Sequence, residues 1–152
     1  MRPSSSSARK QTVEISAVGS AERAIPVLPI LGMPVRDLGW NEALVHLEQK
    51  LVARDGFTHI AFLNANNANV MVGDTEYRAV LERSLVLPDG IGVDIAAHFL
   101  HGGRFTANLN GTDFVPAALT FISRPLRVGL LGATSGVLRS AATNLRRQTP
   151  WH

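Results

Sequence analysis

The sequence predicts an α/β domain of Rossmann-like type, with a largely parallel sheet and helices on both faces. Short apolar runs alternate with amphipathic segments from Thr58 to Arg147, and this alternation is typical of helices packed on a parallel sheet. The 152 residues, 45% of them apolar, suffice for one domain with a buried core. No apolar run reaches the roughly 18 residues of a membrane span. In such sheets, ligands bind beyond the carboxyl ends of the strands.

The first residues differ in composition from the rest of the chain. Residues 1–24 are rich in serine and lack a hydrophobic period, so we predict a disordered tail there and a folded core over residues 25–152. The basic start has no apolar run behind it, which argues against a secretory signal and favours a cytoplasmic location. The absence of cysteine excludes disulfides and thiolate metal sites.

The spacing of apolar residues changes between the first two predicted elements of the core. Residues 25–38 combine β-branched residues with three prolines, which predicts a short edge strand or hairpin, because proline cannot donate to an interior ladder. From Trp40, apolar residues recur at helical spacing up to Leu51, and Gly56 is placed to end that helix. The stripe consists of Trp40, Ala43, Leu44, Leu47 and Leu51.

Two strands with their following helices come next. Residues 58–63 predict a buried strand that ends in a cluster of asparagines, and Asp74 predicts the N-cap of a helix over residues 75–84. Residues 85–87 predict a second short strand, closed by Pro88-Asp89-Gly90, and residues 91–100 a further helix. The cluster comprises Asn64, Asn66, Asn67 and Asn69.

The last third of the chain predicts two more helices and one more strand. Thr112 or Asp113 is placed to begin a helix toward Ile122, with Pro116 tolerated only in its first turn. Residues 127–131 predict a third buried strand. A helix over residues 135–147 follows, and its apolar stripe is Leu138, Ala141, Ala142 and Leu145.

Small and polar residues gather where the predicted strands end. The segment Gly132-Ala133-Thr134-Ser135-Gly136 lies between a strand and a helix, so it predicts either a diphosphate cradle or a tight turn, and it matches neither common nucleotide-binding glycine motif. Asp89 is placed for a general base, although Pro-Asp-Gly is also ordinary turn chemistry. Asn64 and Asn66 are suited to sugar hydroxyls or to capping the next helix.

Other functional classes find less support. Asp94, His98 and His101 share a helical face, but no further ligand accompanies them, so we expect neither a metal site nor a cofactor. No serine lies in a nucleophile elbow. Five arginines and no acidic residue follow position 123, which suits a nucleotide diphosphate, a lipid pyrophosphate, an anionic membrane face or a nucleic acid, or simply a solvated face. The scarcity of aromatic residues argues against nucleic acid.

Three segments, taken in order, resemble the WecG/TagA/CpsF family of glycosyltransferases. They are residues 62–66 (Phe-Leu-Asn-Ala-Asn), residues 87–92 (Leu-Pro-Asp-Gly-Ile-Gly) and residues 110–114 (Asn-Gly-Thr-Asp-Phe), and residues 130–136 extend the match. The resemblance implies a Rossmann-like fold and an inverting hexosyl transfer in bacterial exopolysaccharide, capsule or wall-polymer synthesis. The implied donor is a UDP-sugar, often UDP-N-acetylmannosamine or its uronate, and the implied acceptor is an undecaprenyl-diphosphate-linked sugar.

The resemblance also implies roles for individual residues. Asp89 would take the proton from the acceptor hydroxyl, Asn64 would line the acceptor side, and the turn at Gly132 would face the nucleotide of the donor. The substrate-binding set is Asn64, Asn66, Gly90, Gly92, Gly111, Thr112, Asp113, Gly132, Ala133, Thr134 and Gly136. Peripheral contact with the inner face of the plasma membrane, and a homo-oligomer, are compatible with this reading.

The chain departs from the family pattern at two positions. Phe62 stands where many members carry threonine, and Asn108 where many carry arginine, so a hydroxyl and a positive charge are missing from the expected pocket. A non-catalytic nucleotide-sugar or polyanion-binding module is therefore the alternative function. The strand and helix alternation also breaks off after Arg147, so we expect the core to be incomplete at its C-terminal end and the transferase to be impaired.

Overall fold

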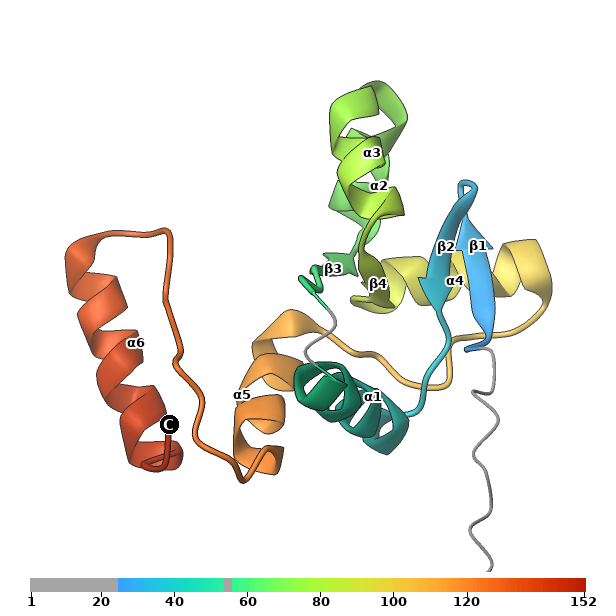
Figure 1. Ribbon diagram of the computed structural model, residues 1–152. Coiled ribbons are helices and arrows are strands. Elements are labelled where there is room, and N and C mark those ends of the chain that lie inside the picture. The colour runs from blue at the N-terminus through green and yellow to red at the C-terminus, as the bar shows by residue number, and fades with distance from the viewer. Residues whose placement is uncertain (1–24, 54–55) are drawn as a thin grey trace, which may run out of the picture.

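The computed structural model describes residues 25–53 and 56–152, and the predicted tail over residues 1–24 lies outside this range. Helices and strands alternate in the mixed α/β order expected from the sequence, as Figure 1 shows. The strands are β1 (Val27–Ile30), β2 (Met33–Arg36), β3 (Ile60–Leu63) and β4 (Leu85–Pro88). The helices are α1 (Trp40–Ala53), α2 (Ala65–Gly73), α3 (Thr75–Glu82), α4 (Ile91–His101), α5 (Gly111–Phe121) and α6 (Ser135–Gln148).

The proline-rich segment at the start of the core forms the predicted hairpin. β1 and β2 pair antiparallel, with Ile30 opposite Met33. The two residues between them, Leu31 and Gly32, have φ values of 49° and 79°, as a tight hairpin turn of the I′ type requires. Met33 and Val35 are fully buried, so the hairpin contributes one face to the core.

The parallel sheet is smaller than expected. β3 and β4 pair in parallel, with Ile60 opposite Leu85 and Leu63 opposite Pro88. Among the described residues each sheet has only two strands, so the prediction of a largely parallel Rossmann sheet is not confirmed, although the mixed α/β class is. Helices nevertheless cover both faces of the β3–β4 pair, because α2, α3 and α4 supply the core cluster around Leu63 and Val86, whereas α1 and α5 supply the cluster around Leu87.

Two helices differ from the prediction. α2, which the sequence did not predict, begins within the asparagine cluster after β3, and its Ala68 and Met71 are buried. α5 begins at Gly111 with Asn110 as its N-cap, earlier than the predicted start at Thr112 or Asp113. Pro116 therefore lies beyond the first turn of α5, and the expectation that it is tolerated only in that turn is wrong. The proline leaves the carbonyl of Thr112 without its helical donor, and Thr112 is exposed, so water can satisfy this carbonyl.

The prediction of a third buried strand at residues 127–131 is wrong. The segment is extended but pairs with no described strand, and Val128, Leu130 and Leu131 are 45%, 39% and 103% exposed. Figure 1 shows it running beside α6, apart from β3 and β4. An apolar run becomes a buried strand only where a neighbouring strand accepts its backbone hydrogen bonds, and none does so here.

The C-terminal residues attach this part of the chain to α5. The backbone N–H of Leu126 donates to Nδ1 of His152 at 3.2 Å, and Nε2 of His152 lies 2.7 Å from the carbonyl oxygen of Leu119. The neutral imidazole with its proton on Nε2 satisfies both contacts. Trp151 donates from Nε1 to the carbonyl of Ile122 at 3.1 Å. These bonds anchor α6, which itself has no buried residue, to the end of α5.

Candidate functional site

The carboxyl ends of β3 and β4 lie side by side and bring two predicted site residues together. Leu63 and Pro88 are register partners at these ends, and the backbone N–H of Asp89 donates to the carbonyl of Leu63 at 2.9 Å. Asn64 and Asp89 are the residues that immediately follow the two strands. The expectation that parallel strands would gather these side chains at one edge agrees with this geometry.

Three helices begin at or next to this edge. Asn64 caps α2 by accepting from the N–H of Asn67 at 2.9 Å, and Asn110 caps α5 by accepting from the N–H of Asp113 at 3.0 Å. α4 begins at Ile91, and its N-cap residue Gly90 offers no side-chain cap. Helix N-termini present backbone N–H groups and a partial positive charge, so their convergence here favours an anionic ligand such as a phosphate group.

The loop that carries Asp89 is fixed from both sides. Gly90 has φ 88° and ψ 168°, a backbone conformation that L side chains rarely adopt. Its N–H donates to Oδ1 of Asn108 at 2.8 Å, and the N–H of Leu109 donates to the carbonyl of Pro88 at 3.0 Å. The backbone around the candidate base is therefore held by β3 on one side and by the segment that leads to α5 on the other.

Glycines at two predicted positions allow neighbouring elements to approach closely. A Cβ added at Gly92 would lie 2.8 Å from Cβ of Ala65, so the first turns of α4 and α2 are in contact there. A Cβ added at Gly111 would lie 2.9 Å from Cδ2 of Phe62. The side chain of Phe62 thus fills the space between the end of β3 and the start of α5, where the family pattern led us to expect a hydroxyl.

The remaining residues at this edge are polar and accessible. Thr112 and Asp113 are exposed in the first turn of α5, and Oδ2 of Asp113 accepts from Nδ2 of Asn110 at 2.9 Å. Asn66 is exposed in the first turn of α2. Asn64 makes the capping contact that the sequence left open as an alternative to sugar binding. The residues gathered at this edge are Asn64, Asn66, Asp89, Gly90, Gly92, Gly111, Thr112 and Asp113.

The predicted cradle at residues 132–136 lies elsewhere. Figure 1 places this turn at the start of α6, at the far end of the extended segment and away from β3 and β4. Gly132 and Ala133 have φ values of 106° and 53°, and the turn is exposed throughout. Thr134 makes no side-chain capping bond to α6. The structure therefore does not bring Gly132, Ala133, Thr134 and Gly136 together with Asp89.

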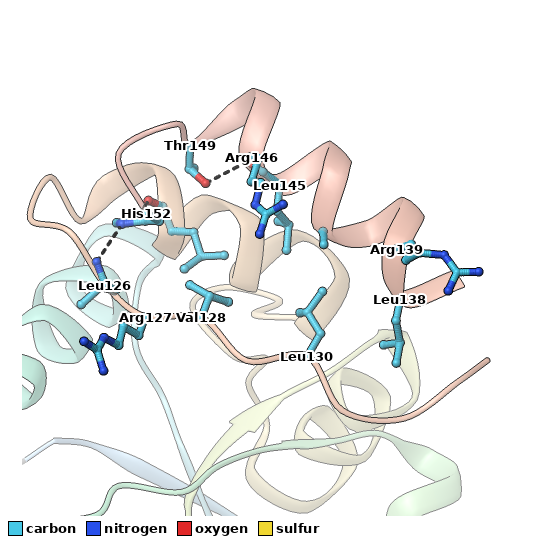
Figure 2. Close-up of a pocket in the computed structure, with 12 residues that line it drawn as sticks. Leu126, Arg127, Val128, Leu130, Leu138, Arg139, Leu145, Arg146, Thr149 and His152 are labelled. Atoms are coloured by element: carbon cyan, nitrogen blue, oxygen red, sulfur yellow. Dashed lines mark hydrogen bonds between the residues drawn. The ribbon is translucent and has the colours of Figure 1, made fainter. Parts of the chain in front are cut away.

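A separate cavity of about 550 Å³ lies between α6 and the extended segment. Its walls are largely apolar, and Figure 2 shows arginine side chains from both elements around it. Sequence reasoning identified the basic end of the chain but not this cavity, because it arises only when the segment and the helix fold against each other. Its lining is Leu119, Leu126, Arg127, Val128, Leu130, Leu138, Arg139, Ala142, Leu145, Arg146, Thr149 and His152.

The family of the chain follows from a comparison with known families. A sequence profile of the glycosyl transferase WecG/TagA/CpsF family matches residues 28–152. The chain belongs to this family. Membership implies a glycosyltransferase of cell-wall or polysaccharide biosynthesis, with a nucleotide-sugar donor and a lipid-linked acceptor in general. No curated protein matches the chain.

Two further features of the described residues bear on what the site can hold. No helix in the described ranges is long and apolar enough to cross a membrane. No group of three or more histidine, aspartate or glutamate residues within these ranges is arranged to hold a metal ion, and Asp94, His98 and His101 form no such group.

Proposed function

We propose that this chain transfers a hexose, N-acetylmannosamine-like or related, from a UDP-sugar to an undecaprenyl-diphosphate-linked acceptor, in exopolysaccharide, capsule or wall-polymer synthesis. The observation that carries the proposal is the position of Asp89. Its carboxylate follows the joined ends of β3 and β4, where α2, α4 and α5 begin. A base beside three helix N-termini is an arrangement suited to deprotonating a hydroxyl next to a diphosphate.

The proposed reaction is a single displacement with inversion. Asp89 takes the proton of the acceptor hydroxyl while its oxygen forms a bond to the anomeric carbon. The bond between that carbon and the UDP oxygen breaks on the opposite face, and UDP leaves with the electron pair. The N-terminal amides of the three helices favour the negative charge that develops on the diphosphate. Asn64, Asn66, Thr112 and Asp113 offer polar groups for the sugar hydroxyls.

The parts of the chain away from Asp89 have proposed roles in binding the nucleotide of the donor and in contacting the membrane. The turn at residues 132–136 would bind the nucleotide end of the donor. The arginines around the cavity beside α6 support contact with an anionic headgroup, because this part of the chain has no acidic side chain to oppose one. We place the enzyme at the inner face of the plasma membrane on this basis.

Two observations favour a second candidate, a non-catalytic module that binds nucleotide sugars or polyanions. The turn at residues 132–136 is separated from Asp89, and Phe62 occupies space where a polar group is expected. Such a module would still bind UDP at the helix N-termini but would transfer no sugar.

The two functions are separated by measuring transfer and binding in parallel. Turnover of UDP-N-acetylmannosamine is followed with and without a lipid-diphosphate-linked sugar acceptor, beside the shift in melting temperature caused by UDP. Acceptor-dependent release of UDP supports the transferase. Stabilisation by UDP without any acceptor-dependent release favours the binding module.

A further inference from the structure

Asn108 makes a hydrogen bond to the residue that follows Asp89. Its Oδ1 accepts from the N–H of Gly90 at 2.8 Å, and the two residues are 18 positions apart in the sequence. Gly90 occupies a backbone region open almost only to glycine, with φ 88°. A bond to this N–H therefore helps to define the direction in which the neighbouring Asp89 leaves the strand.

The other bonds that fix this loop run between backbone atoms. The N–H of Asp89 donates to the carbonyl of Leu63 at 2.9 Å, and the carbonyl of Pro88 accepts from Leu109 at 3.0 Å. Among the bonds described for residues 88–90, the one from Asn108 alone depends on a side chain. It also requires an acceptor, since Gly90 supplies the proton. Asparagine and aspartate provide one, whereas the guanidinium of arginine has only donors.

We propose that Asn108 is a positioning residue for Asp89, which holds the base in its reactive orientation through the N–H of Gly90. The inference rests on the proposed function, because it assigns Asn108 a role in the same transfer. A positioning role and a substrate-binding role for Asn108 differ in which atoms of its side chain are needed. Positioning requires only the oxygen of the Asn108 amide, so a variant that keeps an oxygen and loses the NH₂ group retains the function.

Two nearly isosteric substitutions test the role of the oxygen. Asn108→Leu removes the acceptor, and Asn108→Asp keeps it. Asn144→Leu, an exposed asparagine on α6, serves as the matched control. We expect faster hydrogen exchange at Gly90 in Asn108→Leu and a kcat about two- to tenfold lower, as for the loss of one hydrogen bond. Asn108→Asp keeps the slow exchange and nearly the wild-type kcat, while its added negative charge raises KM for the anionic donor.

The outcomes separate this inference from the proposed function. Unchanged Gly90 exchange and unchanged kcat in Asn108→Leu overturn the positioning role. Equal loss of kcat in Asn108→Leu and Asn108→Asp, with Gly90 still protected in both, also overturns it, because the NH₂ group would then be what matters. If wild-type protein transfers no sugar at all, the proposed function fails. Gly90 exchange in the two variants then decides alone whether Asn108 holds the loop.

Discussion

The ring of Phe62 packs so closely against Gly111 that a Cβ at position 111 would lie 2.9 Å from Cδ2 and 3.0 Å from Cε2 of the ring. The Phe62 ring also packs against other aromatic side chains. Its centroid lies 6.3 Å from that of Phe114, which in turn lies 5.7 Å from that of Trp40, both in edge-to-face geometry. Because this aromatic row spans β3, α5 and α1, Phe62 cannot retreat without disturbing the core cluster around Leu87.

We predict that Gly111→Ala destabilises the fold, although alanine favours helices more than glycine does. The new methyl group would have to displace the Phe62 ring, and such overpacking costs about 1–3 kcal/mol in the free energy of unfolding. Denaturant unfolding measures this loss. In the double variant Phe62→Ala/Gly111→Ala the clash is absent. The double variant should therefore lose less stability than the sum of the losses in the two single variants.

The control is Gly103→Ala, because a Cβ at Gly103 meets nothing within 4 Å. We expect it to change stability by no more than about 0.5 kcal/mol. Strict additivity of the Phe62 and Gly111 substitutions would show that the ring and the glycine are not coupled.

Local patterns were sufficient to predict the elements whose signals lie within a few residues. The prolines of residues 25–38 predict the hairpin, and Asp74 predicts the start of α3, because both effects act through the adjacent backbone. α2 could not be recognised in this way. Its asparagines have low helix propensity, and the helix is stabilised instead by the cap at Asn64 and by burial of Ala68 and Met71.

The site was predictable only as far as strand ends could be recognised. Asn64 and Asp89 each follow an apolar run, so their proximity follows from parallel pairing of β3 and β4. The bond between Asn108 and Gly90 depends instead on the path of the chain after α4, and no local period encodes that path. The same limit explains the error at residues 127–131, where burial depended on a partner strand that no described residues provide.

We predict that Asp89→Asn abolishes transfer and leaves the fold and UDP binding nearly intact. The substitution removes a proton acceptor while it keeps the shape of the side chain and the backbone bond to Leu63. Loss of a general base lowers the rate by about 10²–10⁴-fold. Steady-state turnover, circular dichroism and the UDP-induced shift in melting temperature test the three parts of the prediction. Transfer at the wild-type rate would remove Asp89 from its proposed role.

A further prediction concerns the turn at residues 132–136. If the nucleotide end of the donor binds there, UDP will slow hydrogen exchange of these backbone amides, because the ligand accepts their hydrogen bonds. The exposed loop at Gly102 and Gly103 provides the internal comparison. Equal protection in the two loops would mean that the turn is only a connection into α6.

The last prediction concerns the arginines around the cavity beside α6. Arg139 and Arg146 are exposed and line a largely apolar cavity, and no acidic residue lies beyond Arg124 in the sequence. Their attraction to an anionic bilayer should be worth about 1 kcal/mol per charge near the surface. The double variant Arg139→Glu/Arg146→Glu should therefore bind vesicles of phosphatidylglycerol at least about tenfold more weakly than wild type, with little change in melting temperature.

Arg83→Glu/Arg104→Glu is the matched control for this double variant, because it changes the net charge equally at exposed sites on or after other helices. Sedimentation with phosphatidylglycerol vesicles at several salt concentrations measures the affinity, and phosphatidylcholine vesicles report any binding that does not depend on charge. If binding is driven by net charge alone, the two double variants will lose the same affinity. If the cavity beside α6 is the contact surface, the control will stay within about threefold of wild type. Arg83 and Arg104 follow α3 and α4, which Figure 1 shows apart from α6, and salt screens charges that lie away from the contact. Equal losses in both variants would therefore exclude the cavity as the place where this glycosyltransferase meets an anionic surface.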